Sequence, residues 1–89
     1  MTRKGWVYIL RDTKNRYYIG STVNVEQRMY QHRNGHTQTT NRMQLPVLVL
    51  AQEYATLTEA RLVERKLKKL KRRDYIEKMV SDGFIRMRL

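Results

Sequence analysis

The sequence lacks residue types and patterns whose presence would point to particular classes of protein. It contains no cysteine, which excludes a disulfide framework, a thiolate zinc site and, with them, a fused finger-type module. It contains no run of 18 apolar residues, so we expect no membrane-spanning helix. The apolar stretch near the N-terminus, residues 6–10, is too short for a signal peptide, and a cytoplasmic location is therefore expected.

Acidic residues are also few, which leaves the chain with a large positive charge. Eight Asp and Glu stand against 19 Lys and Arg, so the formal net charge of the 89 residues is +11 at pH 7. An excess of one sign on this scale repels itself and favours a polyanionic partner such as nucleic acid. A chain of this length forms one small domain with a thin core, which we assign to residues 1–83, followed by a loose C-terminal tail at residues 84–89.

Turn residues and apolar patterning divide the chain into six elements in the order β-β-α-β-α-α. Strand-forming residues on both sides of a turn at residues 12–15 indicate a hairpin, and Asn24 can cap the first helix. Residues 36–44 have no periodicity and predict a polar loop. The expected strands are residues 5–10, 17–20 and 47–54, and the expected helices are residues 24–33, a helix opened by Thr58 and running to Leu70, and one that Asp74 or its neighbour caps and that ends near Gly83. The fold class is therefore α+β: a small, mostly antiparallel three-stranded sheet flanked by helices.

The helix from Thr58 has the clearest amphipathic pattern. Apolar residues recur at helical spacing at positions 60, 63, 67 and 70, between positions that carry mostly Lys and Arg. Residues 65–73 alone hold seven cations, whereas a merely solvated helix face normally carries mixed charge. We therefore expect this face to contact nucleic-acid phosphates, with an affinity that falls steeply with salt. A membrane surface is not expected, because so small a core needs the apolar stripe for itself.

Five polar residues occupy positions where a plain scaffold would not need them. Tyr8 and Tyr18 lie in the two strands of the hairpin, which can bring both phenols to one side of the sheet in the right register. Arg28 and His32 are four residues apart on a predicted helix and share a face. Glu64 borders the core-facing stripe of the cationic helix. Singly, each has an ordinary explanation in packing, solvation or a helical ion pair, so the information lies in their joint order and spacing.

The two tyrosines stand in triplets that resemble the paired signature of the GIY-YIG nuclease family. Val7-Tyr8-Ile9 is followed by Tyr18-Ile19-Gly20, although Trp6-Val7-Tyr8 stands where the family has Gly-Ile-Tyr. The resemblance covers about residues 5–70 and is to the compact, stand-alone members of the family. The order of the family's further roles is matched by Arg28, His32 and Glu64.

The resemblance implies hydrolysis of a phosphodiester with the help of one divalent metal ion. Glu64 would be the carboxylate ligand of Mg²⁺ or Mn²⁺, which take oxygen ligands and keep several waters. Arg28 would hold a phosphate oxygen and stabilise the charge of the transition state. Tyr8 would orient or deprotonate the attacking water, and Tyr18 and His32 would assist by hydrogen bonding, phosphate contact or proton transfer. Which of these groups takes the proton first stays open.

One feature departs from the pattern of the family. Several members place an asparagine at the site on or beyond the last helix, but this sequence has no asparagine after Asn41. Lys68 or Lys69, on the same predicted helix as Glu64, could contact phosphate in place of this asparagine.

The interpretation is a small metal-dependent endonuclease that acts on DNA, single-stranded or branched DNA being favoured and RNA remaining possible. Two alternatives are an inactive nucleic-acid-binding protein of the same fold and a basic accessory protein that works on RNA. A monomer is expected, although an edge strand can also pair with a second copy. The residues expected to contact nucleic acid are Arg28, Arg42, Arg65, Lys68, Lys69 and Arg72.

Overall fold

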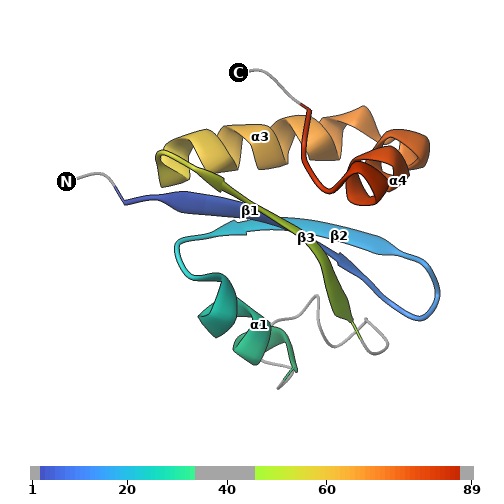
Figure 1. The fold of residues 1–89 in the computed structure, drawn as a ribbon, viewed down its shortest axis with the longest axis horizontal. Helices are drawn as coiled ribbons and strands as arrows, with labels where there is room; N and C mark the ends of the chain where they lie inside the picture. Colours follow the sequence, from blue (N-terminus) through green and yellow to red (C-terminus); the bar gives the residue numbers. More distant parts are fainter. Residues whose placement is uncertain (1–2, 34–45, 87–89) are drawn as a thin grey trace.

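The computed structural model describes residues 3–33 and 46–86, and its elements follow the expected order (Figure 1). The strands are β1 (Gly5–Arg11), β2 (Tyr17–Thr22) and β3 (Val47–Tyr54), and the helices are α1 (Val25–Arg33), α3 (Leu57–Leu70) and α4 (Arg73–Asp82). The expected α+β class is confirmed. Within the described residues, no helix is long and apolar enough to cross a membrane.

The three strands form one antiparallel sheet in the order β2-β1-β3, with β1 in the centre. The register places Tyr8 opposite Gly20 on β2 and opposite Ala51 on β3. At the β1–β2 turn, the buried carboxylate of Asp12 accepts hydrogen bonds from the backbone N–H groups of Lys14 and Arg16 and from Arg16 Nε. Burial by itself raises the pKa of Asp12, but these hydrogen bonds outweigh it and leave the pKa below its ordinary value.

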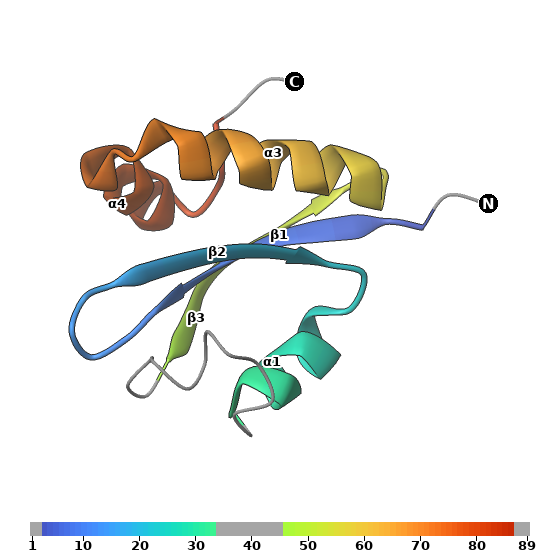
Figure 2. The same cartoon turned by 180° about the vertical axis from the view of Figure 1, so that it is seen from behind.

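The helices cover opposite faces of the sheet (Figures 1 and 2). Helices α3 and α4 lie on one face and α1 lies on the other. Because side chains alternate along a strand, β1 serves both faces. Val7 and Ile9 join the core beneath α3 and α4, whereas Tyr8 and Leu10 form a smaller buried cluster with Met29 of α1. The alternation therefore directs Tyr8 away from the main core and towards α1.

Helix α3 buries its apolar face as the sequence pattern predicts, with Ala60, Val63 and Leu67 in the core. Its start was predicted wrongly, because Thr56 and not Thr58 precedes the first turn. The Thr56 side chain accepts a hydrogen bond of 3.1 Å from the Glu59 backbone N–H, which is a standard N-cap interaction. The Asn24 cap of α1 is confirmed, since its Oδ1 accepts from the Gln27 backbone N–H at 3.0 Å.

Two further predictions near the C-terminus need correction. Asp74 does not cap α4: the N-cap is Arg72, and Asp74 lies in the first turn, where its carboxylate pairs with the Arg72 guanidinium. The loose tail expected from residue 84 is wrong for Ile85, which is 4 % exposed and belongs to the main core. Its backbone N–H donates to Gln52 Oε1, so strand β3 holds this residue. The predicted end of α4 at Gly83 is confirmed.

Candidate active site

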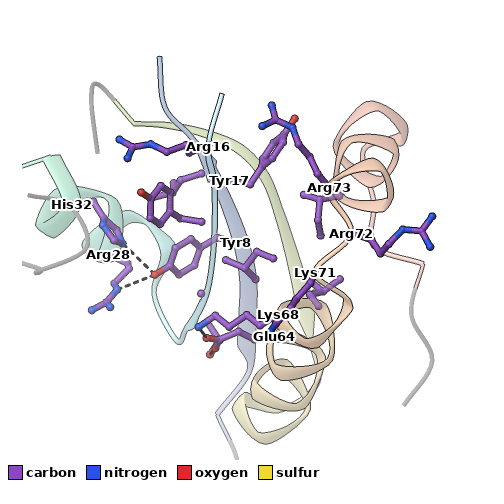
Figure 3. A pocket seen from close by; sticks show the side chains of 17 residues that line it. Tyr8, Arg16, Tyr17, Arg28, His32, Glu64, Lys68, Lys71, Arg72 and Arg73 are labelled. Carbon is purple, nitrogen blue, oxygen red and sulfur yellow. Dashed lines mark hydrogen bonds and ion pairs between the residues drawn. The ribbon is translucent and has the colours of Figure 1, made fainter. Parts of the chain in front are cut away.

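A cleft of about 670 Å³ lies along β1 and β2 and is closed on its two sides by α1 and by the junction of α3 with α4 (Figure 3). All five residues singled out in the sequence line it. They come from four different elements, and Figure 3 shows the Tyr8 phenol between the α1 side chains and Glu64 of α3. The lining set is strongly cationic: Glu64 is its one acidic residue, and its cations are Arg16, Arg28, Lys68, Lys71, Arg72 and Arg73.

Tyr8 is held by two residues of α1. Its side chain is 4 % exposed, and its hydroxyl oxygen accepts a hydrogen bond from Arg28 Nε at 3.1 Å. The same oxygen lies 3.2 Å from His32 Nε2, and the two rings meet edge to face with their centroids 5.7 Å apart. Because Arg28 and His32 are one helical turn apart, a single face of α1 delivers both groups to the phenol.

His32 is a buried histidine with a depressed basicity. Burial disfavours the charged imidazolium and lowers the pKa of His32 below 6.5, and the neighbouring Arg28 guanidinium lowers it further. A neutral imidazole has one ring nitrogen that accepts a proton. Since Arg28 can only donate to the Tyr8 oxygen, the phenol can donate its own proton to His32 when Nε2 is the accepting nitrogen.

Gly20 provides the space in which the Tyr8 ring lies. The two residues are cross-strand partners, and a Cβ atom on Gly20 would lie 2.3 Å from Tyr8 Oη and 2.4 Å from Tyr8 Cζ. No side chain fits at that distance, so the ring and a substituted residue 20 exclude each other. The final glycine of the Tyr18-Ile19-Gly20 triplet is therefore needed for room rather than for backbone conformation.

Tyr18 lies on the same face of the sheet as Tyr8, opposite Leu10. It is half-buried, packs against the Tyr8 and Leu10 cluster and lines the cleft. The expectation that the hairpin brings both phenols to one side is thus confirmed.

Glu64 is fixed by contacts to two other cleft residues. Ser21 Oγ donates to Glu64 Oε1, and Lys68 Nζ donates to Glu64 Oε2 at 2.6 Å. The Glu64 side chain is 19 % exposed, so the carboxylate is reachable from the cleft. Among the described residues, no group of three or more His, Cys, Asp and Glu could hold a metal ion. One accessible carboxylate still fits Mg²⁺ or Mn²⁺, which keep most of their waters and use substrate phosphate as a further ligand.

The predicted nucleic-acid contacts divide into two sets. Arg28, Lys68 and Arg72 line the cleft, whereas Arg65 and Lys69 are exposed on α3 outside it. Arg42 lies outside the described residues, as does the predicted loop at residues 36–44.

Several residues of the cleft were not predicted. Ser21 follows the Tyr18-Ile19-Gly20 triplet directly, and that adjacency was the available signal. Arg73 forms an ion pair with Glu77 and lies over the Tyr17 ring at 5.3 Å, so its position depends on packing between α4 and β2. The other cations missed in the cleft are Arg16 and Lys71.

Comparison with known proteins shows the family of the chain. Residues 4–78 match the GIY-YIG catalytic domain, and the chain belongs to the GIY-YIG family. A UPF0213 protein of Streptococcus pneumoniae serotype 4 is 37 % identical over 73 residues, which are 81 % of this chain and 74 % of that protein. A second UPF0213 protein, from S. pneumoniae strain R6, is 36 % identical over 73 residues with the same coverage. The solution NMR structure of a UPF0213 protein from Bacillus halodurans superposes with a TM-score of 0.57 at 27 % identity, covering 90 % of this chain and 86 % of that one.

Proposed function

We propose that the protein is a divalent-metal-dependent endonuclease that hydrolyses phosphodiester bonds of DNA. The observation that carries the proposal is the single cleft in which Tyr8, Arg28, His32 and Glu64 meet among cationic walls. A nuclease fold is what membership of the GIY-YIG catalytic domain family suggests. Phosphodiester hydrolysis needs a positioned water, a route for its proton and positive charge around the phosphate, and the residues of the cleft offer each of these.

The Tyr8 oxygen is the proposed contact for the attacking water. As this oxygen takes a proton from water, its own proton passes to the neutral imidazole of His32 at 3.2 Å. Arg28 uses Nε for Tyr8 and one Nη1 donor for Gln31 at 3.3 Å, which leaves further donors of the guanidinium for a phosphate oxygen. Arg28 thereby stabilises the charge that accumulates on the phosphate, and Tyr18 contacts water or phosphate from the neighbouring position on β2.

Glu64 is the proposed ligand of one Mg²⁺ or Mn²⁺ ion, and GIY-YIG nucleases typically use a divalent metal. The ion would supply Lewis-acid polarisation of a phosphoryl oxygen. Ser21 fixes the direction of the carboxylate through its hydrogen bond to Oε1. One protein carboxylate binds such an ion weakly until phosphate completes the coordination shell, so metal and DNA are expected to bind cooperatively.

The outer face of α3 is the proposed path of the nucleic-acid backbone next to the cleft. Arg61, Arg65 and Lys69 are exposed there and form no ion pair with a carboxylate of residues 3–33 or 46–86. Cations that form no ion pair within the described part of the chain suit phosphates, which carry no sequence information. We therefore propose recognition by strand state and shape, with single-stranded or branched DNA favoured over an uninterrupted duplex.

One observation favours a second candidate, a nucleic-acid-binding protein of this fold without nuclease activity. The Glu64 carboxylate is engaged by an ammonium group on one oxygen and by a hydroxyl on the other. If that pairing persists in the complex with DNA, no metal ion binds and the cleft holds the backbone without cutting it.

A nuclease assay tests the proposal. Single-stranded, forked and duplex DNA and a matched RNA are incubated with the protein in Mg²⁺, in Mn²⁺ and in EDTA. The expected result is cleavage of DNA that requires the metal and falls by about 10²–10³ in Glu64→Gln and Tyr8→Phe proteins that fold normally. Cleavage that survives both substitutions contradicts the site, binding without cleavage favours the second candidate, and preferential cleavage of RNA changes the substrate class.

A further inference from the structure

The ion pair between Lys68 and Glu64 lies inside the cleft rather than on an outer surface. Lys68 Nζ is 2.6 Å from Glu64 Oε2, and both side chains line the cleft that also contains Tyr8. The Glu64 side chain is 19 % exposed and the Lys68 side chain is 55 % exposed. The carboxylate is therefore mostly buried where it lines the cleft, while the lysine reaches it from a position open to solvent.

The two carboxylate oxygens of Glu64 have different partners, and only at one of them would a metal cation replace another positive charge. Oε1 accepts from the hydroxyl of Ser21, a neutral group on β2. Oε2 is occupied by a positive charge. A divalent cation and an ammonium group at the same oxygen repel each other, so an ion that binds Oε2 must displace Lys68.

We propose that Lys68 occupies the metal-binding oxygen of Glu64 in the free protein, and that the incoming divalent cation displaces its ammonium towards the phosphate in the cleft. The inference rests on the proposed function and adds a regulation of the same site. In the free protein the ion pair lowers the affinity for metal. In the complex the released ammonium supplies a phosphate contact from the helix that also carries Glu64.

The geometry distinguishes Lys68 from its neighbour Lys69. Four residues separate Glu64 from Lys68, which places both on one side of α3, whereas Lys69 is turned to the outside and does not line the cleft. Lysine is also suited to the exchange, because its ammonium is a compact charge on a flexible stem and moves between partners without a fixed hydrogen-bonding geometry.

The first test measures metal binding by the protein alone, by following amide NMR shifts of Ser21, Glu64 and their neighbours during titration with Mg²⁺. Lys68→Met is expected to tighten Mg²⁺ binding by about two- to fivefold, the factor that corresponds to the loss of one exposed ion pair. Lys69→Met removes the same charge from the adjacent position without touching Glu64, and its affinity is expected to equal that of the parent. Glu64→Gln is expected to abolish the response.

The second test measures cleavage of single-stranded DNA at saturating Mg²⁺. There Lys68→Met is expected to cut at least about tenfold more slowly than the parent, although it binds the ion more tightly. The inference is supported if Lys68→Met binds Mg²⁺ more tightly and cleaves DNA more slowly than the parent. Loss of an ion pair with a purely structural role is not expected to change the affinity and the rate in these opposite directions. Unchanged Mg²⁺ affinity in Lys68→Met, an equal change in Lys69→Met, or no Mg²⁺ response in any of these proteins overturns the inference. If the parent cuts no DNA, the proposed function fails, and the metal titration still decides whether Lys68 competes for Glu64.

Discussion

At the scale of single residues, the site depends on what surrounds one phenol oxygen. Arg28 and His32 contact the Tyr8 hydroxyl from α1, and Gly20 leaves the space for its ring across the sheet. These three neighbours differ in what they provide: the guanidinium donates a hydrogen bond, the neutral imidazole has a ring nitrogen that can accept a proton, and the glycine leaves space for the ring. A small change at any of them is therefore expected to reach the chemistry through Tyr8.

Gly20→Ala is expected to displace the Tyr8 ring, because the added Cβ would lie 2.3 Å from the phenol oxygen. Overpacking of this kind costs about 1–3 kcal/mol of stability, and cleavage is expected to fall about as far as in Tyr8→Phe. Urea unfolding combined with the nuclease assay measures both. In a Tyr8→Ala background the same substitution is expected to cost little stability. An equal cost in both backgrounds would show that the clash is not with Tyr8.

The lowered pKa of His32 predicts a pH dependence of stability. The unfolded chain binds a proton at this residue more readily than the folded protein, so the free energy of unfolding is expected to decrease as the pH falls through and below 6.5. In His32→Gln this part of the decrease is expected to disappear. Urea unfolding of both proteins at pH 7.5 and pH 5.5 makes the measurement, and identical losses in the two proteins would contradict a depressed pKa for His32.

At the scale of elements, α3 presents different side chains to the core and to the cleft. Its apolar face supplies Ala60, Val63 and Leu67 to the core, and its cleft side carries Glu64 and Lys68. The direction in which Glu64 points therefore depends on how the helix is seated. Its N-terminus is fixed by the Thr56 cap and by the backbone hydrogen bond of 2.9 Å from Leu57 to the Arg3 carbonyl.

The two threonines at this end of α3 provide a matched pair of variants. Thr56→Ala removes the N-cap hydrogen bond and is expected to lower the free energy of unfolding by about 1 kcal/mol. Thr58→Ala changes an exposed side chain within the first turn and is expected to alter it by less than about 0.5 kcal/mol. Chemical denaturation of both proteins checks the difference, and a larger loss in Thr58→Ala would place the cap where the sequence first suggested.

At the scale of the whole molecule, some of the described cations form ion pairs with acidic residues and others do not. The net charge is +11, and the described acidic residues that form ion pairs engage cations in the cleft, at the β1–β2 turn, at the sheet and on or next to α4. On the outer face of α3, Arg61, Arg65 and Lys69 form no ion pair with a carboxylate of the described residues. Binding of nucleic acid is therefore expected to be strong at low salt and largely independent of sequence.

The logarithm of the binding constant for single-stranded DNA, measured by fluorescence anisotropy in EDTA, is expected to fall steeply and linearly with the logarithm of salt concentration. Arg65→Gln and Lys69→Gln are each expected to reduce the slope by about 0.7. Lys4→Gln is the control, because its ammonium is paired with Glu53 and does not line the cleft. Equal slopes for all three variants and the parent would remove α3 from the nucleic-acid interface.

The sequence by itself determined the elements, their order and the identity of five polar residues that meet in the cleft. Periodicities of 2 and 3.6 residues are local properties, so strands and helices can be read along the chain, and the spacing of Tyr8, Tyr18, Arg28, His32 and Glu64 was sufficient for the resemblance. The ends of elements were less certain, because a cap is one hydrogen bond, and Thr56 and Thr58 offer the same side chain two residues apart.

Only the tertiary structure decided which groups touch. Ser21 reaches Glu64 across 43 residues, and Ile85 reaches Gln52 across 33. Such contacts depend on strand register and on how a helix is seated on the sheet, and neither leaves a periodic mark in the sequence. The sequence allows an ion pair between Glu64 and Lys68, because the two residues are four apart on a helix. That this pair lies inside the cleft follows from which face of α3 packs against the sheet. That orientation is set by burial of the apolar stripe in three dimensions, and it makes an ordinary ion pair part of the site.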